Sequence, residues 1–202
     1  ERINPGDKKN NLANIRKILG ASNISTLRQV SKIYNSFLKK NIYITKSIEI
    51  AEAAKVIENT QRDINIALIN EFNKIFNSMN LDTNKILEAA STKWNFLNFT
   101  PGLVGGHCIG VDPYYLAYSA KKNGIKPNLI LSGRKINESV PHLIVNKCLK
   151  FMKRRKNFKV LFLGLTFKED CPDFRNSKSF KVLSLLNKYT NKIDIYDPYM
   201  DT

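Results

Sequence analysis

A cysteine stands within a glycine-rich stretch of this sequence, in the segment TPGLVGGHCIGVDPYYL of residues 100–116. Cys108 precedes Asp112 by four residues and follows three glycines, which are Gly102, Gly105 and Gly106. Cysteines that only fill a core are usually surrounded by apolar residues, whereas glycines let a backbone adopt positive φ angles or approach a ligand closely. The segment therefore indicates a nucleophilic thiol in a ligand-binding loop, although a tight turn between two helices explains the glycines equally well.

A lysine and an asparagine earlier in the chain are spaced for a shared role. Lys55 and Asn59 lie four residues apart in a helical pattern, so an ammonium and an amide can point at one oxyanion. A cation near Cys108 would also favour the thiolate that a nucleophile requires, and Asp112 could orient a water molecule or a base. His107 points away from the cysteine in extended backbone, which disfavours a Cys-His dyad. The alternative for Lys55 and Asn59 is two surface residues, because the chain has 25 Lys and 24 Asn.

Two cations follow the apolar segment KVLFLGLTF of residues 159–167. Lys168 and Arg175 come just after this predicted buried strand, at the carboxyl edge where open α/β sheets bind ligands. Two cations at that edge suit a phosphate or a pyrophosphate. The alternative is an exposed basic loop that pairs with its own acids, which are Glu169, Asp170 and Asp173. No GxGxxG fingerprint accompanies the strand, so it is not the usual dinucleotide-binding turn.

The elements that would position these residues follow from hydrophobic periodicity. Apolar residues recur every three, four or seven positions from 48 to 79, which predicts one helix about 50 Å long at ~1.5 Å per residue. That length suggests a helix that spans between domains or packs against a second copy. Further helices are predicted at 25–40 (capped by Ser25), 82–90, 114–123, 140–153 and 177–189, and strands at 15–20, 41–47, 159–167 and 192–197. The last strand-helix-strand unit should be parallel and right-handed.

Charge and cysteine content narrow the class of protein. The 202 residues carry a net charge of +16, which invites a nucleic-acid partner. The basic residues are spread over the whole chain, however, so a solvated basic surface is the favoured interpretation. Three cysteines without CxxC spacing and two distant histidines indicate neither disulfides nor a zinc site. No apolar run suggests a membrane span and no signal peptide appears, so we expect a cytoplasmic protein.

Four segments carry a resemblance to a known family, and they are ERINPGDKK, AEAAKVIENTQRDINIALINE, GLVGGHCIGVDPYYL and LGLTFKEDCPDFRNSK. In sequence and order they resemble the UDP-glucose/GDP-mannose dehydrogenase family, closest to its UDP-N-acetylhexosamine 6-dehydrogenase branch. The resemblance implies an α/β fold in three parts. Residues 1–47 would be the remnant of an N-terminal Rossmann-like NAD-binding domain, 48–155 a central helical dimerisation and catalytic region with one long helix, and 156–202 the start of a C-terminal Rossmann-like UDP-binding domain.

The resemblance also implies a chemistry. Such enzymes use NAD to oxidise the C6 alcohol of a nucleotide sugar twice, through a thiohemiacetal and a thioester on a cysteine, to a uronic acid for surface polysaccharide precursors. The implied catalytic residues are Cys108 as nucleophile, Lys55 and Asn59 on the C6 oxygen, Asp112 to place water, and Glu1 at the end of a family Ser-Pro-Glu motif. The implied binding residues are Arg2, Leu97, Gly102, Gly105 and Lys168 for the UDP-sugar and Arg175 for NAD. A homodimer through the long helix is implied as well.

Two departures from the family pattern bear on the substrate. UDP-glucose dehydrogenases have a lysine just before the aspartate after the cysteine, where this chain has Val111, and a second glutamate where it has Pro5. Both favour a UDP-N-acetylglucosamine type of sugar over UDP-glucose, with UDP-N-acetylmannosamine left open. The family's Gly-rich loop and catalytic threonine are not in this sequence, so a truncated chain that is inactive alone is expected. The competing hypothesis is a basic helical dimerisation or nucleic-acid-binding module without catalysis.

Overall fold

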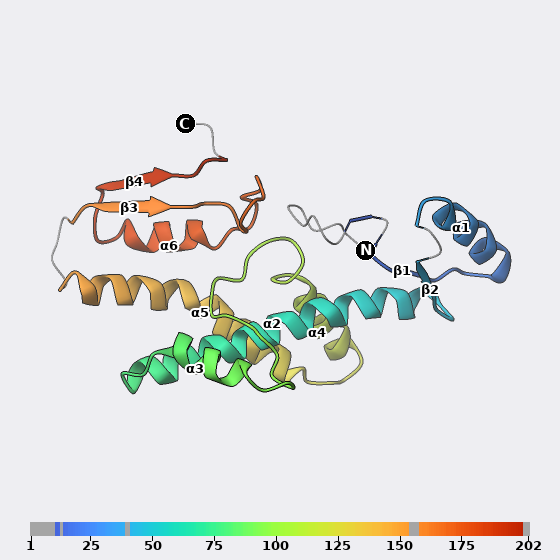
Figure 1. Cartoon of the computed structure of the whole chain (residues 1–202), viewed down its shortest axis with the longest axis horizontal. Helices are drawn as coiled ribbons and strands as arrows, with labels where there is room; N and C mark the ends of the chain where they lie inside the picture. The colour runs from blue at the N-terminus through green and yellow to red at the C-terminus, as the bar shows by residue number, and fades with distance from the viewer. Residues whose placement is uncertain (1–10, 13, 39–40, 154–157, 200–202) are drawn as a thin grey trace. The chain divides into compact units, whose positions relative to one another are not determined.

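The computed structural model describes residues 11–12, 14–38, 41–153 and 158–199, and Figure 1 labels their helices and strands. The chain divides into two compact units. The first comprises Glu1–Glu58 with Glu169–Cys171, and the second comprises Asn59–Lys168 with Pro172–Thr202. The second unit contains the glycine-rich loop of residues 100–111 with Cys108, here called the cysteine loop, and the last strand-helix-strand segment.

The first unit contains a small parallel sheet and a crossover helix. The predicted strands and helix are present as β1 (Lys17–Leu19), α1 (Ile24–Phe37) and β2 (Ile42–Ile44), and the two strands pair in parallel. The predicted helix cap, Ser25, is wrong, because Ser25 lies inside the first turn of the helix. Asn23 is the cap, since its extended backbone lets its side-chain oxygen accept a hydrogen bond from an N–H of that turn over 2.8 Å.

Helix α2 (Ile48–Ser78) is one continuous helix of 31 residues, so the prediction of a long helix over 48–79 is confirmed. Its buried positions include Thr60 and three residues with amide or carboxylate side chains, Asn59, Asp63 and Asn70. The last three bear on the site. These positions are four and seven residues apart, which places them on one face of the helix. Buried polar groups need hydrogen-bond partners, and α5 and the cysteine loop supply them. The short helix α3 (Thr83–Ser91) follows α2, as predicted.

Helices α4 (Asp112–Lys122) and α5 (Asn128–Phe151) pack against each other as a hairpin. The predicted start of α5 at residue 140 is wrong, because the helix begins at Asn128. Its first half buries Gly133, Arg134 and Asn137, so the core-facing positions there show no apolar period. Pro141 lies inside the helix and adds to the error, since a proline usually ends or kinks a helix.

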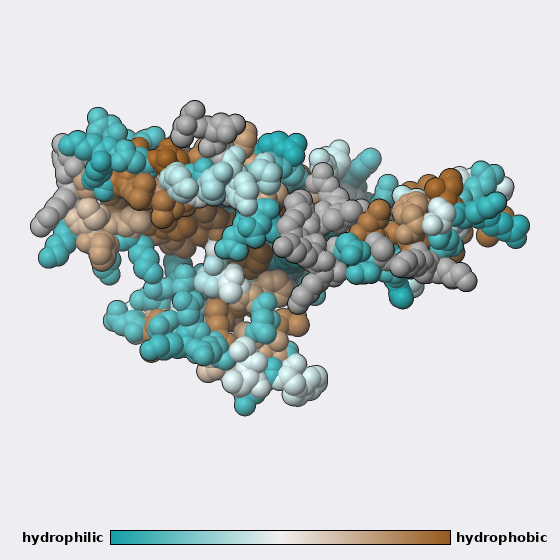
Figure 2. All heavy atoms as spheres, turned by 45° about the horizontal axis from the view of Figure 1, so that its top comes forward, coloured by the Kyte–Doolittle hydropathy of each residue, from teal (hydrophilic) through white to brown (hydrophobic). Residues whose placement is uncertain are grey.

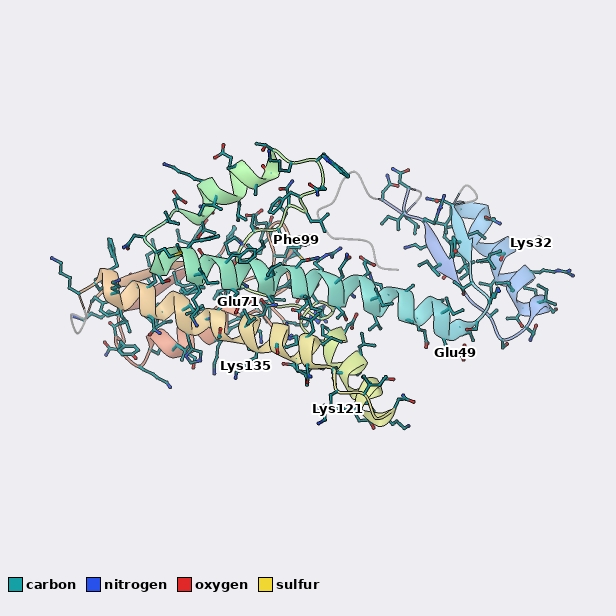
Figure 3. The ribbon with its side chains drawn as sticks, turned by 90° about the horizontal axis from the view of Figure 1, so that it is seen from below. Lys32, Glu49, Glu71, Phe99, Lys121 and Lys135 are labelled. Carbon is teal, nitrogen blue, oxygen red and sulfur yellow. The ribbon has the colours of Figure 1, made fainter. Side chains whose placement is uncertain are left out.

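Helices α2 and α5 run side by side, as Figures 1 and 3 show. The two backbones come close at Gly133, where an added Cβ would lie 3.5 Å from Ile64 Cγ1 and 3.6 Å from Ala67 Cβ. Glu71 on α2 and Lys135 on α5, both labelled in Figure 3, are exposed. Of the polar residues that α2 buries, Asp63 and Asn70 bond α5, whereas Asn59 bonds Asp112 at the start of α4.

The second parallel sheet consists of β3 (Val160–Leu163) and β4 (Ile193–Tyr196), joined by α6 (Ser179–Leu186) as predicted. Helix α6 lies between the strands and α5 (Figure 1). The buried cluster there is Val145, Val182, Leu185 and Leu186, with Val160, Phe162 and Ile193 packed on it. Beyond the strands, the Asp197 carboxylate accepts the N–H groups of Leu165 and Thr166 at 2.5 and 3.1 Å, and these backbone bonds lower its pKa.

The other face of this sheet is exposed in the part of the chain that the structure describes. Leu161 and Leu163 are 64% and 67% exposed, whereas the alternating positions Val160 and Phe162 pack on α6. Figure 2 shows apolar surface over these two strands at its upper left. The prediction of a fully buried strand is therefore wrong for half of its residues, because α6 covers one face only.

Candidate functional site

The cysteine loop ends in a turn that leads directly into α4. The half-buried Cys108 accepts hydrogen bonds at its carbonyl from the N–H groups of Val111 and Asp112, at 3.0 and 2.8 Å. Asp112 is the first residue of α4, and Pro113 follows it in the first turn, where a proline costs no hydrogen bond. This turn holds Asp112 at a fixed separation from the nucleophile predicted at Cys108.

The structure joins two of the predicted catalytic residues. Asn59 of α2 donates its side-chain N–H to Oδ2 of Asp112 over 2.6 Å. Asn59 is only 2% exposed, so its amide cannot move to another partner in solvent. Because an amide donor occupies one carboxylate oxygen, the other oxygen of Asp112 is left to accept a proton or a hydrogen bond from a water molecule.

A second asparagine of α2 holds the start of the loop. Asn70 makes two hydrogen bonds to the backbone of Gly102. Its Oδ1 accepts the Gly102 N–H at 2.8 Å, and its Nδ2 donates to the Gly102 carbonyl at 3.0 Å. The same Nδ2 also donates to Oδ1 of Asn137 on α5 at 2.9 Å. Leu97, which precedes this point in the chain, is exposed at 61%. The predicted substrate-loop glycine is thus fixed by a buried amide, while Leu97 faces solvent.

A buried ion pair lies under the cysteine loop. Arg134 of α5 donates to Oδ1 of Asp63 on α2 at 2.6 Å, and their side chains are 1% and 0% exposed. Arg134 also bonds Glu138 and lies 5.3 Å from the ring centre of Tyr114 on α4. Burial raises the pKa of Asp63, and the charge of Arg134 opposes that shift without cancelling it. Burial lowers the pKa of Arg134, but the charges of Asp63 and Glu138 and the hydrogen bonds to Tyr114 and Asp63 together outweigh burial, so that pKa is raised.

The middle of the cysteine loop packs on the segment that follows β3. The Gly106 N–H donates to the carbonyl of Asn176 at 3.2 Å, and Asn176 Nδ2 donates back to the Gly106 carbonyl at 2.7 Å. Gly106 has φ +82°, and a Cβ there would lie 2.9 Å from the ring of Phe167. At Gly105 a Cβ would lie 2.7 Å from the Asn176 carbonyl oxygen. Both glycines are therefore required by close approach, which explains the sequence run.

His107 and Arg175 share one carboxylate. His107 Nε2 lies 2.9 Å from Oδ2 of Asp173, and the ring of Phe167 lies edge-on to the imidazole. Arg175 donates from Nε to Oδ1 of Asp173 at 3.0 Å and from Nη2 to Oδ2 at 2.8 Å. The Arg175 bonds, followed by the His107 bond, lower the pKa of Asp173. The Arg175 side chain is still 70% exposed, so its guanidinium is held in place and accessible.

The remaining predicted residues have simpler surroundings. The carbonyl of Lys168 accepts the Thr166 hydroxyl at 3.0 Å, which orders the backbone that carries this lysine. Lys55 lies in the first unit and pairs with Glu58, one turn on, at 2.8 Å. The predicted residues Glu1 and Arg2 lie outside the residues that the structure describes.

Sequence reasoning missed the residues that support the loop. Asn70, Asn137, Arg134 and Asn176 were not singled out, and Asp173 was considered only as a surface acid. One signal was available, because Asn59, Asp63 and Asn70 put three polar groups on one face of an amphipathic helix. That pattern indicates a buried polar network, although it does not identify the partners on α5.

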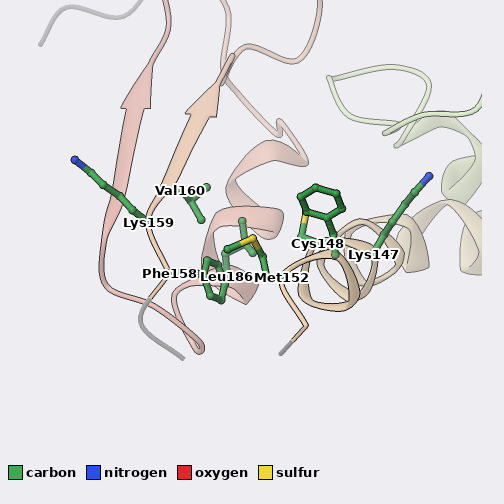
Figure 4. A pocket seen from close by; sticks show the side chains of 8 residues that line it. Lys147, Cys148, Met152, Phe158, Lys159, Val160 and Leu186 are labelled. Carbon is green, nitrogen blue, oxygen red and sulfur yellow. The ribbon is translucent and has the colours of Figure 1, made fainter. Parts of the chain in front are cut away.

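A pocket of about 400 Å³ opens elsewhere in the second unit, where α5 ends near β3 and α6. Figure 4 shows its lining, which is Lys147, Cys148, Phe151, Met152, Phe158, Lys159, Val160 and Leu186. No predicted site residue lines it, and its walls are apolar apart from the ends of the two lysines. Among the described residues no cluster of three acidic, histidine or cysteine side chains could hold a metal ion. None of the described helices is both long and apolar enough to cross a bilayer.

The chain belongs to the UDP-glucose/GDP-mannose dehydrogenase family, because two domains of that family match it. Residues 49–139 match the central domain of that family, and residues 161–202 match its UDP-binding domain. The resemblance inferred from the four sequence segments and the α/β fold class are thereby confirmed.

Individual relatives agree with this assignment. The chain is 49% identical over 205 residues to UDP-N-acetyl-D-glucosamine 6-dehydrogenase of Salmonella typhi, covering 100% of this chain and 48% of that protein. It is 48% identical over 204 residues to the Pseudomonas aeruginosa protein of that name, covering 99% and 48%. The solved structure of UDP-D-ManNAc dehydrogenase from Pyrococcus horikoshii matches with TM-score 0.88 and 32% identity, covering 100% of this chain and 50% of that one. The chain thus spans about half the length of these proteins.

Proposed function

We propose that this chain is part of an enzyme that oxidises the C6 alcohol of a UDP-2-acetamido-hexose, of UDP-N-acetylglucosamine type, to the uronic acid with NAD. The observation that carries the proposal is the Asn59 to Asp112 hydrogen bond beside Cys108, in a chain of this family. Val111 and the names of the 49% and 48% identical relatives support the acetamido sugar. UDP-N-acetylmannosamine is the second candidate, because the Pyrococcus horikoshii protein bears that substrate in its name.

The chain offers one described group for the cofactor. The Arg175 guanidinium is held by Asp173 and remains 70% exposed, and guanidinium groups are preferred partners of phosphates and pyrophosphates. NAD supplies the hydride acceptor for both oxidations when it is bound. The Lys168 ammonium and the glycine loop are the proposed contacts to the UDP-sugar.

Cys108 carries the covalent part of the proposed mechanism. After C6 has lost its first hydride and the hydroxyl proton, the thiolate adds to the aldehyde carbon and forms a C–S bond. The resulting oxyanion is stabilised by the amide of Asn59 and, in the proposal, by Lys55. Loss of a second hydride re-forms the carbonyl as a thioester. Asp112 then orients a water molecule and takes its proton as the water attacks, the C–S bond breaks, and Cys108 leaves as the thiolate.

We also propose that the enzyme is a homodimer through α2. In the second unit Leu68, Ile75 and Met79 are 45%, 45% and 58% exposed and lie seven and four residues apart, so they form one apolar stripe. Trp94 nearby in sequence is 96% exposed. Exposed apolar surface of this kind marks interaction sites on soluble proteins, and in a two-fold symmetric dimer the same stripe of each copy would pack on the other.

The test uses the full-length enzyme, meaning a protein of the relatives' length that contains these 202 residues. Cys108→Ala should lower uronic acid formation about a thousandfold or more, because only positioning and oxyanion stabilisation remain. UDP-sugar affinity should be largely retained, since the thiol makes no binding contact in the proposal. Cys148→Ala, an exposed cysteine on α5, is the matched control and should behave as wild type. Near wild-type acid formation by Cys108→Ala contradicts the mechanism, and a preference for UDP-glucose contradicts the substrate.

A further inference from the structure

We propose that Asn176 is a positioning residue for the nucleophile, and that it couples the UDP-binding segment to the cysteine loop. The inference rests on the proposed role of Cys108. Asn176 itself belongs to none of the predicted catalytic or binding residues. Its assignment comes from the contacts that it makes with Gly105 and Gly106.

Asn176 forms hydrogen bonds with both the backbone carbonyl and the backbone N–H of Gly106 in the cysteine loop. Its Nδ2 donates to the Gly106 carbonyl at 2.7 Å, and its carbonyl accepts the Gly106 N–H at 3.2 Å. Gly106 thus has both backbone groups satisfied by a single residue that lies 70 positions away in sequence. Because Gly106 precedes Cys108 by two residues, these two hydrogen bonds fix the position of the backbone that carries the thiol.

The neighbouring glycine makes this contact steric as well as polar. A Cβ at Gly105 would lie 2.7 Å from the Asn176 carbonyl oxygen and 3.3 Å from the backbone nitrogen of Lys178. Both are backbone atoms, which cannot rotate away as a flexible side chain can. The cysteine loop and the segment containing Asn176 are therefore in backbone contact, and neither can shift without the other.

The segment around Asn176 is itself rigidly held. Asn176 has φ +55°, a left-handed conformation that asparagine tolerates better than most residues. The N–H of Ser177 bonds the Phe174 carbonyl at 3.1 Å and closes the turn. Lys178 reaches Glu138 on α5 at 2.7 and 2.8 Å, which ties the turn to the helix pair. Asn176 is thus a fixed anchor.

The segment around Asn176 also contains Arg175, the residue proposed to bind the cofactor, and Asp173, which makes a second contact with the cysteine loop. Arg175 precedes Asn176 directly, and Asp173 bonds both Arg175 and His107, the residue before the nucleophile. The stretch of residues 173–176 therefore contacts the cysteine loop and also contains Arg175, the residue proposed to bind a ligand phosphate. Asn176 supplies the closer attachment of the two, because it bonds main-chain atoms of the loop.

The decisive experiment compares two substitutions of Asn176 in the full-length enzyme. Asn176→Gly removes the donor and keeps the positive φ without strain. Asn176→Asp keeps the size and tolerates the same φ, but a carboxylate cannot donate to the Gly106 carbonyl. A role as a donor predicts that both variants lose function and that Asp is at least as damaging as Gly. A role in filling space predicts the opposite, with Asp close to wild type.

Two readouts separate positioning from general stability. With limiting iodoacetamide and peptide mass spectrometry, Cys108 should alkylate about threefold faster or more in both variants, because the loop opens more often. Cys148 on α5 is exposed and serves as the internal reference, with an unchanged rate. In steady-state kinetics kcat should fall about tenfold or more, since small misplacements of a reacting group are costly, while UDP-sugar affinity should change little.

The outcomes distinguish this inference from the proposed function. Unchanged Cys108 labelling and unchanged kcat in Asn176→Gly overturn the positioning role, as does an Asp variant that behaves like wild type. If one variant fails to fold, as shown by faster labelling of the buried Cys171, the other variant decides. If Cys108→Ala still forms acid, the proposed mechanism fails, yet the labelling of Cys108 still reports whether Asn176 holds the loop.

Discussion

Asn59 and Asp112 are joined by a hydrogen bond of 2.6 Å between residues 53 positions apart in the sequence. The bond connects the face of α2 to the first residue of α4, and the turn before α4 contains Cys108. The amide therefore fixes which oxygen of Asp112 is available to a water molecule. Asn59 has a positioning effect on Asp112 in addition to its predicted contact with the C6 oxygen.

Replacing Asn59 should impair the chemistry much more than the fold. Asn59→Leu is nearly isosteric but leaves Asp112 without its donor, so we expect acid formation in the full-length enzyme to fall about a hundredfold. Asn77→Leu, an exposed asparagine on the same helix, is the control and should leave turnover unchanged. Turnover and thermal midpoint are measured together, and an Asn59→Leu enzyme with normal kcat removes Asn59 from the site.

Two glycines with positive φ allow strain and steric contact to be separated. Gly106 has φ +82° and faces Phe167, whereas Gly124 has φ +76° and nothing within 4 Å of its added Cβ. Each alanine substitution should cost about 1–2 kcal/mol of backbone strain. Gly106→Ala must also displace the Phe167 ring, so we expect it alone to lower kcat about tenfold or more. Equal kcat values for the two variants contradict a steric role for Gly106.

The candidate site residues could be selected from the sequence because their signals are local, and their catalytic roles stay predictions. Cys108 and Asp112 share one loop, and Asn59 belongs to a helix with clear apolar periodicity. Glycines in a short run also indicated close approach, and the structure shows the neighbours, Phe167 and Asn176. The long helix α2 and the strands of both sheets were predicted for the same reason, since each follows from a pattern within one segment, and parallel pairing was predicted for the second sheet.

The supporting network was not predictable, because it depends on contacts between distant segments. Asp63 and Arg134 are 71 residues apart, and neither has an apolar neighbour pattern that marks it as buried. The first half of α5 was missed for the same reason, since Arg134 and Asn137 occupy its core-facing positions. An analysis of hydrophobic periodicity assigns polar residues to the surface, so it cannot identify those that are buried. Only the partners across the helix pair reveal their true environment.

The buried pair of Asp63 and Arg134 should be strongly coupled. Arg134→Met leaves a carboxylate buried without its cation and should cost about 3–5 kcal/mol of unfolding free energy. The double variant Asp63→Leu with Arg134→Met should cost less than the sum of the single changes, because both charges are then gone. Lys159→Met, which breaks the exposed pair with Asp194, should cost under about 1 kcal/mol. Additive costs in denaturant titrations argue against coupling.

The apolar stripe of α2 should mediate self-association. Leu68→Lys combined with Ile75→Lys places two charges on the stripe, and we expect the full-length enzyme to shift from dimer to monomer. Leu129→Lys introduces a charge at a position that is 68% exposed on α5, and it should leave the dimer intact. Sedimentation velocity at micromolar concentration measures both. A wild-type enzyme that is monomeric there disproves the dimer.

Asp173 should make a distinct contribution to stability at acidic pH. The Arg175 bonds, then the His107 bond, lower its folded-state pKa below the ordinary value of 3.8, so the charged carboxylate favours the folded state. A lowered carboxyl pKa adds stability that is fully present above pH 3.8 and is lost as the pH falls through the folded value. Asp173→Asn has no carboxylate at this position to protonate, so it should not show this loss of stability in acid.

The thermal midpoint of the wild-type enzyme should therefore fall more steeply below pH 4 than that of Asp173→Asn, whereas above about pH 5 the wild type should be the more stable. Asp194→Asn removes an exposed carboxylate of β4 and corrects for the loss of one negative charge. Midpoints are recorded from pH 7 down to pH 2.5 at constant ionic strength. If Asp173→Asn and Asp194→Asn show the same slope in acid, the His107 and Arg175 contacts do not stabilise the folded chain.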